Sequence, residues 1–591
     1  MTGKPFMKSA RFLPTIPMNR PSPGLRPPSP RLAGRGQGEG CQFGSWSRYM
    51  RKNESRLSVN RAGCGSQTRR PDRASVRRSG SWSQCARKSE RRLSMNLPLR
   101  PPRRSRPRPR FVSSWFRGRA RGRARGRLGS WSRCAILLLG MSLLDRSALA
   151  ATVELVVDTT QTIGEIDLTR YALGQGGLSE KPMIAAHLDQ LAQLQPRTIR
   201  LFVQEYFDLY PKPGRYHWDT LDHSIEAILA TGARPLLCLC FKPRVLFPKI
   251  EQDVVHPTHY KDWEKLVFEL VKHCNQRRRY GVEYWEVGNE PDIGEDGGCP
   301  YRFKPEDYVA YYTHTANAIL RADPKARVGG PALAGYRSRL GDALIEHCAK
   351  GGAPLHFFSW HLYSNNPGQL RQSIKEVKAK LAKHLRLAGT ETILDEWNMS
   401  LGNPVLTPAF QPAFVLETTH DFYEEGLARA AYYHIRDFFV DPSRFSPWMS
   451  AQGTDFMAHW WNVMPQYDGL WDNQGRVRPA YYAFRLLSLI KGQKLAVSGT
   501  SGDVKAFAAR NGSWNHVVFW NFPSPGPGEV VEAVVRFPKG QRGQFRFMKL
   551  DASAPVNNLA VIRQGSAGEL EAQPVRTKLE PYDVDWIEIG Q

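Results

Sequence analysis

Two glutamates follow apolar segments that have the composition of buried strands. Glu290 stands near the end of YWEVGNEPD, where Pro291 prevents the strand from continuing. Glu396 comes after the apolar run of ETILDEWN, later in the chain. A carboxylate beside a buried strand is costly unless it has a partner or a chemical role. Two carboxylic groups, one donating a proton and the other attacking or activating water, hydrolyse glycosidic bonds. The pair therefore predicts a glycosidase, provided that the fold brings both side chains together.

The segments around these glutamates alternate between expected strands and amphipathic helices. The expected strands are residues 171–177, 197–202, 234–240, 283–289, 326–332, 355–363, 391–398 and 454–463. Eight strand–helix units predict an α/β fold of the TIM-barrel type, (β/α)₈, whose strands direct their carboxyl ends toward one pocket. Glu290 would then end the fourth strand and Glu396 the seventh. An open doubly wound sheet is the alternative, but no G-x-G-x-x-G follows a first strand.

The pattern of apolar and polar residues changes after the helical run that ends near residue 492. Short alternating apolar runs punctuated by Gly, Pro and Asn follow, which is typical of antiparallel strands. We therefore expect a (β/α)₈ catalytic domain over residues 151–493 and an antiparallel β-sandwich domain over residues 494–591. We expect the second domain to have a structural role, in support of the barrel.

The basic character of the chain is confined to its beginning. Residues 1–150 hold 35 of the 83 Lys and Arg residues but only 5 of the 55 Asp and Glu residues. Residues 1–130 are rich in Arg, Pro and Ser and predict a disordered leader. This leader either binds polyanions or is absent from the mature protein. Residues 151–591 carry 48 basic and 50 acidic residues, so we expect no nucleic-acid partner for them.

Residues 131–150 resemble a signal peptide. Arg133 precedes the apolar run CAILLLGMSLL, and the segment ends in Ala148-Leu149-Ala150. The run is too short to span a bilayer, so no stable membrane insertion is expected. We predict cleavage after Ala150 and a secreted or periplasmic protein. Export would permit a disulfide at Cys299, although buried free thiols are the expectation for Cys238 and Cys240.

Several motifs together resemble glycoside hydrolase family 39. They are WEVGNEPD, VGGPALAG, SWHLY, LDEWN and GLWDNQGRVRPAYYAFRLL, and the resemblance covers residues 152–590. The family contains retaining hydrolases, including β-xylosidases and α-L-iduronidases, and its fold is a barrel with a trailing β-sandwich. The resemblance implies that Glu290 is the general acid/base and Glu396 the nucleophile. Asn289 would contact the 2-hydroxyl of the sugar.

The same resemblance implies further residues of the pocket. His361 and Tyr363 would line it from the end of the sixth strand. Trp460 or Trp461, expected on strand eight, would stack on a sugar, and alternation allows only one of the two to face the pocket. Arg200 on strand two could keep a glutamate ionised. Each of these side chains also has an ordinary structural explanation, as packing or as an ion pair.

The sugar and the reaction class stay open at this point. β-Xylosidases of the family carry histidine where this chain has Phe202. The leading hypothesis is an exported, retaining, xylosidase-like hydrolase of an oligo- or polysaccharide. Alternatives are a uronidase, with Lys242 or Arg244 binding the uronate, an exopolysaccharide hydrolase, and a non-catalytic glycan-binding barrel. No metal or organic cofactor is expected, because two carboxylates and water suffice. The sequence predicts no oligomeric state.

Overall fold

The structure is a computed structural model, and it describes residues 151–401, 407–523, 528–550 and 559–590. The expected leader (1–130) and signal peptide (131–150) lie outside the described residues and stay predictions. Within the described ranges, every helix falls short of the length or the apolar character needed to cross a membrane.

Eight parallel strands close into a barrel in the order β2-β3-β4-β5-β6-β7-β8-β9, as predicted. Their bounds are β2 Tyr171–Gln175, β3 Thr198–Val203, β4 Arg234–Leu239, β5 Tyr284–Val287, β6 Arg327–Leu333, β7 Phe357–Tyr363, β8 Glu391–Asn398 and β9 Arg429–Tyr433. Nearly every residue of these strands is buried. Parallel strands have this composition because helices cover one face and the barrel interior the other.

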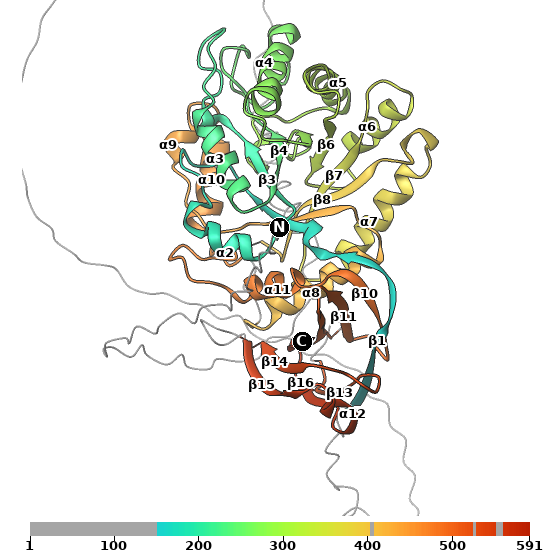
Figure 1. Cartoon of the computed structure of the whole chain (residues 1–591). Helices are drawn as coiled ribbons and strands as arrows, with labels where there is room; N and C mark the ends of the chain where they lie inside the picture. Colours follow the sequence, from blue (N-terminus) through green and yellow to red (C-terminus); the bar gives the residue numbers. More distant parts are fainter. Residues whose placement is uncertain (1–150, 402–406, 524–527, 551–558, 591) are drawn as a thin grey trace, which may run out of the picture. The chain divides into compact units, whose positions relative to one another are not determined.

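Helices lie outside the strands (Figure 1). Those that follow barrel strands are α2 Leu188–Gln193, α3 Asp219–Ala230, α4 Tyr260–Lys272, α5 Pro305–Ala322, α6 Arg339–Ala349, α7 Pro367–Leu381, α8 Phe410–Glu424 and, before the second domain, α11 Pro479–Leu487. In α4 the buried side chains recur every three or four positions and form one apolar stripe. α5 begins with Pro305, whose missing N–H is no loss in the first turn.

The eighth strand is not where the sequence predicted it. Residues 454–463 form the end of α10 (Ala451–Ala458) and a π-helix (His459–Val463). Ser450 begins α10, because its hydroxyl oxygen accepts a backbone N–H of the first turn at 3.1 Å. The barrel is closed instead by β9, which pairs with β2 and β8. β9 has only five residues, too short an apolar run to stand out beside the tryptophans that follow it.

The second domain is built on a nine-stranded sheet in the order β15-β14-β17-β12-β11-β10-β1-β13-β16. The strands after the barrel are β10 Lys491–Ser498, β11 Val504–Asn511, β12 Trp514–Asn521, β13 Val531–Arg536, β14 Gln544–Leu550, β15 Leu559–Ser566, β16 Val575–Leu579 and β17 Val584–Gly590, with the short helix α12 Glu569–Ala572 before β16. Pairing is antiparallel except between β1 and β13.

The first strand, β1 (Ala151–Asp167), belongs to this sheet and not to the barrel. It pairs with β10 on one side and with β13 on the other. Leu155 and Val157 alternate with exposed or half-buried residues and enter the core of the sheet. The expected domain boundary at residue 151 is therefore wrong: residues 151–167 complete the β domain, and the barrel begins at β2. A strand that pairs with partners more than three hundred residues away leaves no local signal of its destination.

Helix α8 joins the barrel to the sheet. Its residues are buried around nearly the whole circumference. Glu417 accepts a hydrogen bond from the Trp520 indole at 2.9 Å and forms an ion pair with Lys505, both from the sheet domain. Phe410 packs on Phe522 with ring centroids 5.7 Å apart. These contacts bury both the polar and the apolar faces of α8.

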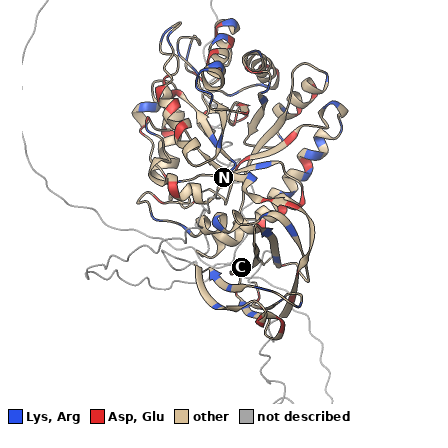
Figure 2. Ribbon diagram, viewed as in Figure 1, with Lys and Arg blue, Asp and Glu red and all other residues tan. Residues whose placement is uncertain are grey.

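Charges of both signs are interspersed over the described chain (Figure 2). This matches the near-neutral count of residues 151–591. Cys238 and Cys240 are buried free thiols, as predicted, and Cys299 is a buried free thiol as well.

Candidate active site

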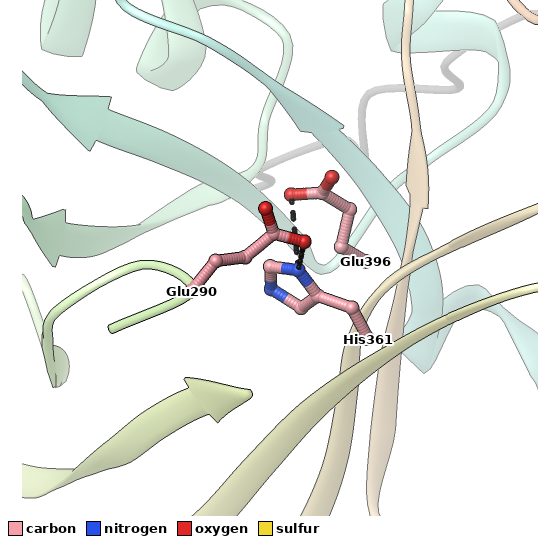
Figure 3. Close-up of side chains that lie close together, drawn as sticks. All are labelled: Glu290, His361 and Glu396. Carbon is pink, nitrogen blue, oxygen red and sulfur yellow. Dashed lines mark hydrogen bonds and ion pairs between the residues drawn. The ribbon is translucent and has the colours of Figure 1, made fainter. Parts of the chain in front are cut away.

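The barrel brings Glu290 and Glu396 together, as Figure 3 shows. Glu290 comes three residues after β5, the fourth barrel strand, and Glu396 lies in β8, the seventh. One carboxylate oxygen of each and one ring nitrogen of His361 all lie within 4.8 Å of one another. The two side chains whose spacing the sequence left open therefore share one pocket.

The backbone at Glu290 is shaped for this position. Its φ of 45° is left-handed, which few residues other than glycine adopt and which is concentrated at functional sites. Its N–H donates to the carbonyl of Ala332 in β6 at 2.8 Å. Gly297 lies against the side chain, since a Cβ there would stand 1.8 Å from Oε2 of Glu290. A larger residue at that position would displace the carboxylate.

Both oxygens of Glu396 are held. The hydroxyl of Tyr363 donates to Oε1, and Nη1 of Arg200 donates to Oε2 at 3.1 Å. Tyr363 ends β7 and Arg200 lies in β3, so two different strands fix one carboxylate. Its orientation is set before any ligand arrives, which is what a reacting carboxylate requires.

Arg200 is the centre of a buried polar network. Its Nε lies 2.7 Å from Oε2 of Glu286 and 3.1 Å from Oδ2 of Asp395. Its Nη2 donates to Oδ1 of Asn289 at 2.8 Å. The side chain of Arg200 is 1% exposed, so its hydrogen bonds to Glu286 and Asn289 and its ion pair with Asp395 are little weakened by solvent.

Glu286 and Asp395 are members of the site that sequence analysis did not single out. Burial raises the pKa of Glu286 to about 8 despite the charge of Arg200. Burial alone would also raise the pKa of Asp395, but Arg200 and His361 hold it below its ordinary value. The sequence contained a signal that could have identified them. Both are acidic residues inside apolar strands, and they belong to the same two motifs as Glu290 and Glu396.

A strand irregularity lets Asp395 and Glu396 share Arg200. In the pairing of β7 with β8, Trp360 lies opposite Leu394, but His361 lies opposite Glu396. One residue of β8, Asp395, is thus left over, as in a β-bulge. In a regular strand, successive side chains would point to opposite faces, and Asp395 and Glu396 would not both face Arg200.

His361 bridges the acidic groups. Its Nδ1 lies 2.9 Å from Oε1 of Glu290, and its Nε2 lies 3.4 Å from Oδ2 of Asp395. Burial lowers the pKa of His361, but the charges of Glu396 and Asp395 outweigh burial and raise it well above its ordinary value. Burial raises the pKa of Glu290 to about 7, with His361 opposing and the charges of Glu396 and Asp292 adding to the shift. Glu290 can thus hold a proton near neutral pH, as a general acid must.

Trp460 and Trp461, both predicted for the pocket, lie in one helical segment and pack against different residues. Trp461 packs on Phe438 with centroids 4.4 Å apart and on Tyr433 at 6.1 Å, next to the pocket residue Tyr363. Trp460 packs against Phe456 within the same helical segment, at 5.9 Å. Trp461 is therefore the candidate for contact with a sugar, although from a helix and not from the expected strand.

Glu290, His361 and Glu396 also have the ligand types of a metal site. The Nδ1 that faces the other two is bonded to Glu290, and the pKa of His361 is raised, which favours the protonated ring. In this structure the same three groups form an ion-pair network, with Nδ1 of His361 2.9 Å from Oε1 of Glu290 and 3.8 Å from Oε2 of Glu396.

A closed (β/α)₈ barrel with carboxylic side chains at its fourth and seventh strands defines a barrel protein of the glycosidase type. The family model described as glycosyl hydrolases family 39 matches residues 210–522, more than half of the chain. The chain belongs to this family.

Individual relatives agree with the family. A β-xylosidase of Caldicellulosiruptor saccharolyticus is 26% identical over 307 residues, covering 47% of this chain and 57% of the relative. A β-xylosidase of Geobacillus stearothermophilus is 26% identical over 235 residues, 34% of this chain and 45% of the relative. The chain thus spans about half the length of these curated relatives. The crystal structure of a monomeric β-xylosidase from Caulobacter crescentus CB15 supports the fold, with a TM-score of 0.59 at 20% identity over 74% of this chain and 99% of that one.

Proposed function

We propose that this protein is a retaining glycoside hydrolase that cleaves β-xylosides by a two-glutamate, double-displacement mechanism. The observation that carries the proposal is the short spacing of Glu290 and Glu396, whose facing oxygens lie within 4.8 Å. Retaining glycosidases hold their carboxyl groups about 5–5.5 Å apart, whereas inverting enzymes leave about 6.5–9.5 Å for a water molecule. The two β-xylosidase relatives support the choice of sugar.

In the first step, Glu290 donates its proton to the glycosidic oxygen while a carboxylate oxygen of Glu396 bonds to the anomeric carbon. The bond from that carbon to the leaving oxygen breaks, and the leaving group departs as an alcohol. Asn289 supports this step: because its Oδ1 accepts from Arg200, its amide nitrogen is left to donate to the 2-hydroxyl of the sugar.

In the second step, Glu290 is a carboxylate and takes a proton from water. The hydroxyl oxygen bonds to the anomeric carbon, the ester bond to Glu396 breaks, and both glutamates return to their starting states. His361 holds Glu290 in place through both steps. A pKa of about 7 suits a group that must give up and regain one proton in each cycle.

A uronidase is less well supported. Lys242, one of the two cations considered for a uronate, is 2% exposed, and its Nζ donates to the backbone carbonyl of Glu251 at 2.8 Å. Arg244 lines a different cavity from the pocket of Glu290 and Glu396. Arg200, the cation that reaches Glu396, already contacts two further carboxyl groups.

We further propose that the protein is exported, with cleavage near Ala150. Ala151 already pairs with Val531 in β1, so a chain starting there would keep this pairing between β1 and β13. Mass spectrometry of the mature protein, recovered from the medium or periplasm of an expressing bacterium, tests this. Export predicts an N-terminus at or near Ala151; a cytoplasmic protein that retains residues 131–150 would contradict it.

Azide rescue tests the assignment of the two glutamates. The wild-type chain should hydrolyse aryl β-xyloside, and Glu290→Ala and Glu396→Gly should not do so efficiently. Azide should restore turnover of Glu290→Ala with a β-glycosyl azide as product, and of Glu396→Gly with an α-glycosyl azide. Near wild-type turnover by Glu396→Gly without azide would reject the mechanism.

A further inference from the structure

A second cavity opens at the end of the barrel where Glu290 and Glu396 lie. Its volume is about 350 Å³, and its walls come from the segments that follow β3, β4 and β9. Its lining includes Glu205, Tyr206, Arg244, Arg444 and Trp448. Sites for small ligands occupy about 300–1,000 Å³, so this space is large enough to hold one.

The cavity is separate from the catalytic pocket but shares a wall with it. None of the side chains that hold Glu290 or Glu396 lines it. Tyr206 and Trp448 belong to one apolar cluster with Phe438, and Trp461 packs against that cluster. Trp461 also packs against the cluster that includes Tyr363 at the catalytic pocket. A continuous aromatic wall therefore runs from the nucleophile to the second cavity.

Arg244 brings a hydrogen-bond donor to the lining of the cavity. It is exposed, and it makes no hydrogen bond or ion pair with any residue in the described ranges. Two residues earlier, Lys242 binds the carbonyls of Ile250, Glu251 and Pro300 and so fixes the base of the loop that carries Arg244. Of the two cations considered as ligand contacts, Lys242 therefore has a structural role, whereas Arg244 lines the cavity.

Glu205 supplies an acceptor to the lining of the cavity. The backbone N–H of Lys242 donates to its Oε1. Burial raises the pKa of Glu205 to about 7. Asp208 adds a second carboxyl group to the lining, and Arg444 forms an ion pair with Glu180. The lining therefore carries both signs of charge rather than one.

This lining fits a polyhydroxylated, neutral ligand better than an anion. Sugar hydroxyls need donors and acceptors side by side, whereas a carboxylate would be repelled by Asp208. Aromatic side chains offer flat apolar walls to the carbon-bound hydrogens of a sugar ring. We propose that this cavity is an accessory subsite that binds a neutral sugar unit of the glycan, with Arg244 and Glu205 contacting its hydroxyls. This inference rests on the proposed function, since it assigns a substrate longer than one sugar.

Titration calorimetry tests the subsite without turnover. The full chain with Glu396→Gln is titrated with β-1,4-xylotetraose and with xylotetraose bearing a uronate branch. Arg244→Ala removes the donor, and Val245→Trp fills the cavity from its lining. Lys249→Ala is the matched control, an exposed cation on the same loop that does not line the cavity.

We expect Arg244→Ala to weaken xylotetraose binding about tenfold, the loss expected for a charge-assisted hydrogen bond. Val245→Trp should weaken it at least as much, because the larger side chain occupies the cavity. Lys249→Ala should leave it unchanged. In the otherwise wild-type enzyme, kcat/KM for aryl β-xyloside should stay within about twofold for all three. The subsite is rejected if the parent does not bind xylotetraose, if neither cavity variant weakens it, if only the uronate-branched ligand responds, or if aryl xyloside hydrolysis falls equally. A wild-type enzyme that cleaves no glycoside rejects the proposed function instead, while the calorimetry still decides the subsite.

Discussion

His361→Gln tests how the site sets the protonation of Glu290. Glutamine keeps a hydrogen-bond donor near Oε1 of Glu290 but removes the imidazolium charge that lies 2.9 Å away. His361 lowers the pKa of Glu290, while burial and the charges of Glu396 and Asp292 raise it. Removing the charge therefore raises the pKa of Glu290 further above its present value of about 7.

The size of this shift follows from the kind of bond that is changed. A hydrogen bond to a charged group contributes about 1.5–3 kcal/mol and a neutral one about 0.5–1.5 kcal/mol. Replacing the first by the second costs the carboxylate form about 1–1.5 kcal/mol, or about one pKa unit. Glu290 must be protonated to act as acid, so activity falls as pH rises through its pKa. His361→Gln should move this alkaline limb upward by about one pH unit.

The assay is kcat/KM for aryl β-xyloside across about pH 4 to 9, a range that brackets ordinary glutamate and the raised value of Glu290. His223→Gln, an exposed histidine on the outer helix α3, is the matched control and should leave the profile unchanged. An alkaline limb of His361→Gln that stays in place or moves to lower pH would refute this account of the Glu290–His361 pair.

Two further predictions concern the supports of the site. Arg200→Met leaves buried carboxyl groups without their cation and should lower the free energy of unfolding by about 3–5 kcal/mol in urea titrations; Arg197→Met, an exposed pair, should cost at most about 1 kcal/mol, and equal losses would contradict the buried network. Gly297→Ala introduces a Cβ 1.8 Å from Oε2 of Glu290 and should reduce kcat by at least about tenfold with the fold intact by circular dichroism. Gly389→Ala is the control, because a Cβ at Gly389 would meet open space. An unchanged kcat in Gly297→Ala would mean that the segment around Gly297 moves to accommodate the methyl group, and would contradict this prediction.

The two glutamates could be predicted because Glu290 comes just after an apolar strand and Glu396 lies near the end of another, in a regular succession of strand–helix units. Position along a parallel barrel then fixes which end of the strand they occupy. Pro291 helped by ending the pattern after β5. Arg200 was a candidate because of the family resemblance, and the glutamate that it reaches is Glu396, at 3.1 Å.

The features that escaped prediction depend on contacts distant in sequence. β1 is an ordinary amphipathic strand, and only its pairing with β10 and β13 assigns it to the second domain. The role of Asp395 depends on a one-residue irregularity between β7 and β8, which strict alternation along a strand would exclude. The tryptophans at residues 460–461 misled because aromatic residues favour strands, yet Ser450 begins a helix before them.

The most direct test of the central claim is to trap the glycosyl-enzyme. An aryl 2-deoxy-2-fluoro-β-xyloside slows the second step, so a covalent intermediate should accumulate and be found by peptide mass spectrometry. One sugar should be bound through an ester to Glu396, and NMR of the normal reaction should show a product of unchanged anomeric configuration. A label on any other residue, or an inverted product with no label, would contradict it.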